Sequence, residues 1–116
     1  MTLDAEVLEQ LLDMTGGDVE FVDSLVDTYL ADSPSLVERL RAAAADGDVP
    51  ATVLPAHTLA STSLTLGAMT FGQTCRSLEA DARTGVVPDL APRVEAIAAD
   101  FDAVRASLLQ LRADRA

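Results

Sequence analysis

The chain has 116 residues, of which 49% are hydrophobic and 3% aromatic, with a single histidine and a single cysteine. Such a hydrophobic content argues against a disordered chain, the length fits one domain, and a lone cysteine excludes an internal disulfide. Its 8 basic residues are all arginines and face 19 acidic residues, which gives a formal net charge of -11. Because such a surface repels phosphate backbones and anionic lipids, we expect a protein that binds neither nucleic acid nor membranes. The lone cysteine fits a reducing compartment, so a cytoplasmic location is expected.

The first half of the chain has apolar residues at helical spacing. A short first helix is expected from the residues Leu3, Val7, Leu8, Leu11 and Leu12. Gly16-Gly17 ends this helix, and Asp18 is placed to cap a longer one that stops at 46–48. Ser33-Pro34 lies inside the longer helix and is expected to break or kink it, because proline has no backbone donor.

The second half predicts a helical hairpin followed by a final helix. The hairpin helices are expected at Val49–Leu66 and at about Met69–Thr84, joined at Leu66-Gly67-Ala68. Pro55 lies within the first of them, where proline costs about 3 kcal/mol unless the helix bends or begins late. The final helix carries apolar residues at alternating steps of four and three: Leu90, Val94, Ile97, Phe101, Val104, Leu108 and Leu111.

These elements predict an all-α protein, an antiparallel four-helix bundle with a short N-terminal capping helix. We expect residues 1–116 to form a single domain, with the histidine-bearing hairpin at about 49–84.

The direction of His57 decides whether the hairpin carries chemistry. A helical wheel centred on Leu59 as the inward residue places His57 about 160° away, on the outer face. Five further residues are predicted to share this outer face: Val53, Leu54, Ala60, Ser61 and Leu64. His57 is then either an ordinary surface histidine or a nucleophile at the centre of a docking surface, since a neutral imidazole has one unprotonated nitrogen.

Two other chemistries are disfavoured by the pattern. Cys75 lies on the apolar stripe of the second hairpin helix, which faces inward, whereas His57 faces outward, so a thiol–imidazole pair is not expected. One histidine and one cysteine on different faces also do not provide a tetrahedral metal site.

An ordered set of motifs resembles a known signature. His57-Thr58-Leu59 is followed by Leu66-Gly67-Ala68, then by Cys75 and by Leu78-Glu79. This order and spacing resemble the histidine-containing phosphotransfer (HPt) domain, whose pattern is roughly AHxLKGS, then LGA, then a helix with Cys and LE. The upstream segment from Gly16 to Pro34 is similar as well, so the resemblance covers nearly the whole chain.

The resemblance implies a function in a two-component phosphorelay. His57 would accept a phosphoryl group from a phospho-aspartate of a receiver domain and pass it to another receiver aspartate. The expected partners are response-regulator receiver domains, a hybrid sensor histidine kinase, or both, with this chain as a monomer. We expect no cofactor of its own, with Mg²⁺ held by the partner receiver domain. Whether the domain is free-standing or part of a larger kinase stays open.

The chain departs from the family pattern directly after the histidine. The family usually has lysine three residues after it and glycine four residues after it, whereas this chain has Ala60 and Ser61. The alternative is therefore an HPt-like docking module that binds receiver or kinase domains without being phosphorylated.

The second hairpin helix offers the nearest polar residues. With the turn at Gly67, Glu79 is expected near His57, with Arg76 and Arg83 within about one turn on either side. Glu79 lies at the spacing where the family often has a glutamine or glutamate bonded to the histidine, so by hypothesis it holds the Nδ1 proton; the alternative is a solvated surface acid. Arg83 falls where some family members carry a cation, and the resemblance implies that it is a phosphate neighbour. Arg76 is assigned to the partner-binding surface together with the outer-face residues named above.

Overall fold

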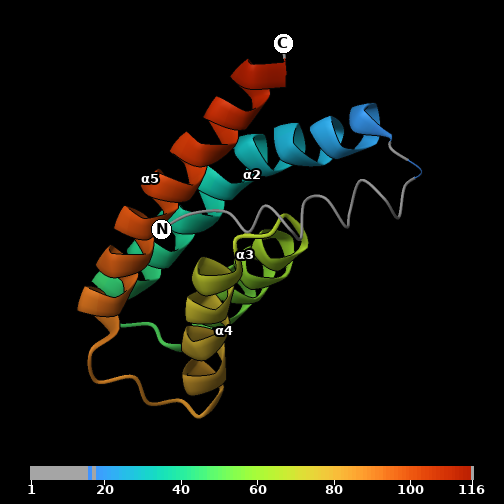
Figure 1. The fold of residues 1–116 in the computed structure, drawn as a ribbon. Helices are drawn as coiled ribbons and strands as arrows, with labels where there is room; N and C mark the ends of the chain where they lie inside the picture. The colour runs from blue at the N-terminus through green and yellow to red at the C-terminus, as the bar shows by residue number, and fades with distance from the viewer. Residues whose placement is uncertain (1–15, 17, 116) are drawn as a thin grey trace.

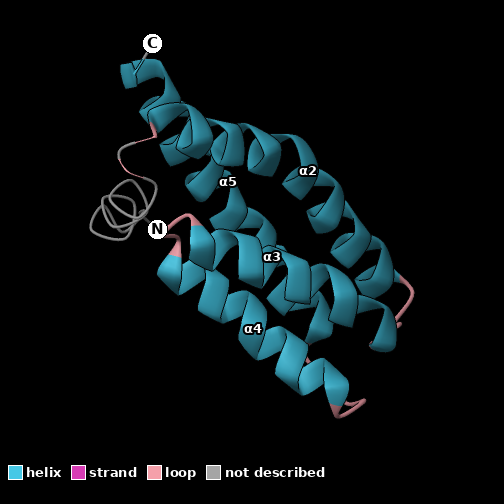
Figure 2. Cartoon of the chain, turned by 90° about the vertical axis from the view of Figure 1, so that its right-hand side faces the viewer, coloured by secondary structure: helices cyan, strands magenta, loops and turns pink. Residues whose placement is uncertain are grey.

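The computed structural model describes Gly16 and residues 18–115, which fold into helices joined by short turns (Figure 1, Figure 2). The elements are α2 (Val19–Ala45), a 3₁₀-helix (Pro50–Thr52), α3 (Val53–Thr65), α4 (Met69–Arg83) and α5 (Leu90–Arg115). The predicted antiparallel four-helix bundle is confirmed. The expected N-terminal capping helix lies outside the described residues. Within the described range, no helix is long and apolar enough to cross a membrane.

Pro34 lies inside α2 without ending it. The helix begins at the cap Asp18, whose Oδ1 accepts a hydrogen bond of 2.9 Å from the Phe21 N–H, and it continues for 27 residues. Figure 1 shows that α2 changes direction in its middle part. The predicted kink is thus present and the predicted break is not. Buried residues on both sides of the proline, Tyr29 and Val37, keep the two parts packed on the bundle and offset the missing backbone bond.

The first hairpin helix begins later than predicted, at Val53 rather than Val49. Residues Pro50–Thr52 form a 3₁₀ turn, in which Asp48 Oδ1 accepts a hydrogen bond from the Ala51 N–H. Pro55 therefore falls in the first turn of α3, where the backbone N–H has no partner inside the helix and nothing is lost. The late start thus accommodates the proline two residues before His57.

Aromatic and hydroxyl side chains hold the inner face of α3 against the other helices. The hydroxyl groups of Tyr29 on α2 and Ser63 on α3 share a buried hydrogen bond of 2.8 Å. Phe101 of α5 lies 6.1 Å, between ring centroids, from both Tyr29 and Phe71. The predicted apolar seam of α5 is buried from Leu90 to Leu108. The Tyr29–Ser63 hydrogen bond and the buried Leu59 turn this face of α3 inward, which leaves the opposite face for solvent.

The close contact between α3 and α4 is made at Gly72. A Cβ atom at this position would lie 2.6 Å from Leu64 Cγ and 3.2 Å from the Leu64 backbone nitrogen. A second contact joins His57 to Glu79. Between the two contacts α3 advances seven residues and α4 goes back seven, so the helices are antiparallel and in register along this stretch.

We expect Gly72→Ala to destabilise the bundle by about 1–3 kcal/mol, because the added methyl group overpacks the contact with Leu64. Alanine at an open helical position would instead stabilise by about 1 kcal/mol relative to glycine, so the sign of the change is informative. Chemical denaturation measures it, with Gln73→Ala on the exposed side of α4 as the control. Equal or greater stability of Gly72→Ala would contradict the proposed contact, and adding Leu64→Ala should relieve the overpacking.

Candidate functional site

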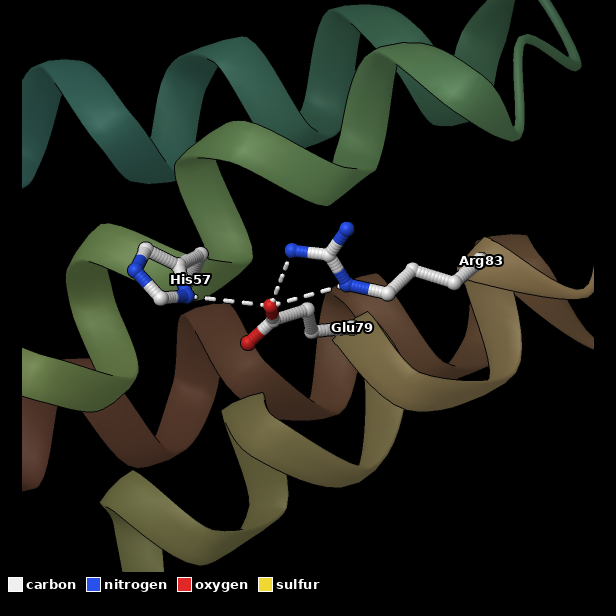
Figure 3. A network of polar contacts seen from close by, with 3 residues as sticks. All are labelled: His57, Glu79 and Arg83. Atoms are coloured by element: carbon white, nitrogen blue, oxygen red, sulfur yellow. Dashed lines mark hydrogen bonds and ion pairs between the residues drawn. The ribbon is translucent and has the colours of Figure 1, made fainter.

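His57 lies on the outer face of α3, with 54% of its side chain exposed. Its neighbours in sequence, Ala56 and Leu59, are buried on the inner face. The helical wheel thus predicted the direction of the imidazole correctly. One ring nitrogen, Nδ1, points to α4 and the other, Nε2, points away from it (Figure 3).

Three hydrogen bonds meet on one oxygen of Glu79. Its Oε2 atom lies 3.0 Å from His57 Nδ1, 3.1 Å from Arg83 Nε and 2.7 Å from Arg83 Nη2 (Figure 3). The Glu79 side chain is only 11% exposed, whereas those of His57 and Arg83 are 54% and 59% exposed. A carboxylate that is largely removed from water is therefore satisfied by two partly exposed donors, one from each helix.

The charge of Glu79 determines the tautomer of His57. The hydrogen bond from Arg83 lowers the pKa of the Glu79 carboxyl below its usual value, against the opposing effect of burial, and the hydrogen bond to His57 lowers it further. An ionised carboxylate only accepts hydrogen bonds, so Nδ1 of His57 carries the proton. In the neutral ring Nε2 is then the unprotonated nitrogen, and it is the one that faces away from Glu79.

A shallow hollow of about 320 Å³ lies beside the histidine. It is lined by the residues His57, Arg76, Glu79, Ala80 and Arg83. The four residues from α4 repeat at helical spacing and form one stripe along the helix. Two arginines and one carboxylate thus surround the imidazole in a chain whose formal net charge is -11. Sequence reasoning did not identify Ala80, and the signal for it was this spacing.

Two comparisons with known proteins found a match for this chain. The sequence model of the Hpt domain family matches residues 24–107, well over half of the chain. The chain belongs to the Hpt domain family. This Hpt domain also resembles the crystal structure of histidine-containing phosphotransfer protein B (HptB) from Pseudomonas aeruginosa PAO1. The TM-score is 0.83 at 29% identity, over 97% of this chain and 95% of HptB. No curated protein sequence matches this chain.

The surroundings of His57 in this Hpt domain differ from the predicted apolar ring. Ala60 was predicted on the outer face, but it is buried at 1% exposure, because α4 packs against that side of α3. Leu64 is half-buried over Gly72, and Val53 is half-buried against the core. Among the predicted surface residues of α3, Leu54 and Ser61 are exposed. The wheel treated α3 as packed on one side, whereas the bundle covers it on two.

Cys75 takes no part in the site. It is buried in the core, and this burial raises the pKa of its thiol to about 12, with a smaller contribution from the negative charge of Asp100. The prediction of a structural cysteine is consistent with this position. Among the described residues, no group of three or more histidine, cysteine, aspartate or glutamate side chains is arranged to hold a metal ion.

We expect Cys75 to react with iodoacetamide at pH 8 at least about 100-fold more slowly in the folded protein than in denaturant, because the thiolate is the reactive form. Burial raises the pKa of the Cys75 thiol, so the folded state favours the neutral thiol. The stability that the buried neutral thiol contributes is present below pH 9 and is lost as pH rises towards about 12. Mass spectrometry of the alkylated protein measures the rate. Rapid alkylation without unfolding would show that the thiol is accessible, and Cys75→Ala provides the unlabelled control.

Proposed function

We propose that this Hpt domain is a phosphoryl carrier of a two-component phosphorelay, with His57 as the phosphoacceptor. The observation that supports this most directly is the imidazole itself, which is more than half exposed while its Nδ1 is held by a nearly buried carboxylate. That arrangement presents an unprotonated Nε2 to a partner in a fixed orientation. The family match and the similarity to HptB, named as a histidine-containing phosphotransfer protein, support the same function.

The proposed phosphoryl donor is the aspartyl phosphate of a receiver domain, in a response regulator or in a hybrid sensor histidine kinase. The Nε2 lone pair attacks phosphorus, and a P–N bond forms as the bond from phosphorus to the aspartate oxygen breaks. The aspartate leaves as a carboxylate with the electron pair. The proton on Nδ1 stays, so the ring becomes a cation beside Glu79, whose carboxylate stabilises it. Transfer to a second receiver aspartate reverses these steps.

The chain needs no cofactor of its own for this chemistry in our proposal. A Mg²⁺ ion held by the partner receiver domain would neutralise charge on the phosphoryl oxygens. The roles left for this chain are to present Nε2, to hold the Nδ1 proton on Glu79 and to supply cationic side chains near the transferred group.

We test the function by offering the protein a panel of phosphorylated receiver domains. The expected result is a phosphate label that is labile in acid and stable in base, as expected for phosphohistidine, and its complete loss in His57→Asn. Thr65→Ala, an exposed change farther along α3, should label normally. If no receiver domain labels the wild-type protein while binding is intact, the phosphotransfer function is wrong, and the docking module is the better explanation.

Arg83 was hypothesised to be a phosphate neighbour, and in the structure it is engaged elsewhere. Two of its nitrogens donate to Glu79, so Arg83 reaches a phosphoryl group only by giving up this pair. We propose that Arg83 acts first as a positioning residue, which keeps Glu79 ionised and oriented towards His57.

We expect Arg83→Ala to slow phosphoryl transfer in the wild-type background and to have little further effect in a Glu79→Gln background. The reason is that a residue acting through Glu79 loses its role once the carboxylate is absent, which makes the two changes non-additive. Rates of transfer from one phosphorylated receiver to the four proteins measure the coupling. Additive effects would assign Arg83 to the phosphoryl group instead, and an unchanged rate and receiver affinity in Arg83→Ala alone would remove both roles.

A further inference from the structure

The register of the α3–α4 hairpin places Arg76 opposite the position where the family lysine is missing. His57 and Glu79 lie at the same height, as do Leu64 and Gly72. Moving three residues along α3 from His57 leads to Ala60, and moving three residues back along α4 from Glu79 leads to Arg76. Both positions therefore lie about 4.5 Å from the histidine along the hairpin axis, towards its turn.

The reactive nitrogen of His57 is directed to the same end of the site. The two ring nitrogens of imidazole point outward in widely divergent directions, and Nδ1 is the one bonded to Glu79. Figure 3 shows the second nitrogen on the side of the ring away from Arg83. Because Arg76 precedes Glu79 on α4 and Arg83 follows it, the arginine at the Nε2 end of the hollow is Arg76.

Arg76 is also free to bind an anion. Arg83 is paired with Glu79. Arg93, at the start of α5, is paired with Asp81 of α4. Within the described part of the chain, Arg76 has neither a hydrogen bond nor an ion pair to a side chain, although it lines the hollow beside His57. An exposed, unpaired guanidinium in a strongly acidic protein leaves a local positive charge without a counter-charge.

We infer that Arg76 binds the phosphoryl group carried on Nε2 of His57, and so replaces from α4 the lysine that α3 lacks at Ala60. The inference rests on the proposed function of His57. A guanidinium binds two phosphoryl oxygens through parallel N–H donors, which suits a dianionic group held at the surface. No exchange of existing ion pairs is needed for Arg76 to do this. Arg83 remains on Glu79 while the phosphoryl group is present.

The test uses phosphoramidate, a small donor that transfers its phosphoryl group to histidine with release of ammonia and needs no partner protein. The full chain is labelled as wild type, Arg76→Ala, Arg76→Lys, Arg83→Ala and Arg39→Ala. Arg39 is the matched control, because it is an exposed arginine on α2 that does not line the hollow. The labelling rate and a ³¹P NMR pH titration of the phosphohistidine are recorded, and circular dichroism verifies folding.

We expect Arg76→Ala to label about tenfold or more slowly than Arg39→Ala, and Arg76→Lys to recover most of the rate. In the titration, the phosphoryl group of Arg76→Ala should change from the dianion to the monoanion at a higher pH than in the wild type, because a nearby cation favours the dianion. Arg83→Ala should move this midpoint less than Arg76→Ala does, because Arg83 acts on the phosphoryl group only by offsetting the charge of Glu79.

Two results would overturn the inference. If Arg76→Ala matches Arg39→Ala in both measurements, Arg76 does not bind the phosphoryl group. If Arg83→Ala moves the titration midpoint and Arg76→Ala does not, that role belongs to Arg83. Failure of the wild-type protein to label at all, from phosphoramidate as well as from receiver domains, would instead overturn the proposed function and the inference with it.

Discussion

The close packing of α3 on α4 is the constraint on which the site depends. Gly72 removes the side chain that would separate the helices at Leu64, and seven residues away on each helix the same register brings His57 to Glu79. A hydrogen bond of 3.0 Å between residues 22 apart in sequence needs both the separation and the rotation of the two helices to be set within narrow limits. On the other side of α3, the buried hydrogen bond between Tyr29 and Ser63 helps to set this rotation.

A few charged side chains determine the electrostatics of the site, although the protein as a whole is strongly acidic. Glu79 is removed from water on the inner side of the imidazole, and its charge is offset by Arg83. In the proposed transfer, the carboxylate therefore orients the ring without leaving a bare negative charge beside an incoming phosphoryl group. The buried Glu79 below the exposed histidine provides a fixed acceptor for the Nδ1 proton. The arginines that line the hollow weaken the repulsion of an anionic group by the rest of the acidic surface.

Much of the site was predictable because the regular geometry of a helix relates the positions of residues that are close in sequence. The direction of His57 followed from the wheel, and the proximity of Glu79 followed from counting residues on either side of Gly67. The error concerns packing by another element: Ala60 is buried because α4 covers a second side of α3. For Pro34 the pattern left a break or a kink open, and α2 continues through it because residues on both sides of it are packed. Neither the covering helix nor the packing is visible in a local pattern.

The sequence by itself determined the helical class, the seam of α5, the outward direction of His57 and the inward direction of Cys75, because these depend on a repeat of 3.6 residues along one helix. The tertiary structure alone decided which charges meet. Arg83 is paired with Glu79 and Arg76 is left unpaired, although both lie within about one turn of the same residue on α4. Spacing places both arginines on one stripe. Which of them is engaged depends on the side-chain geometry around a carboxylate that also binds a residue of the neighbouring helix.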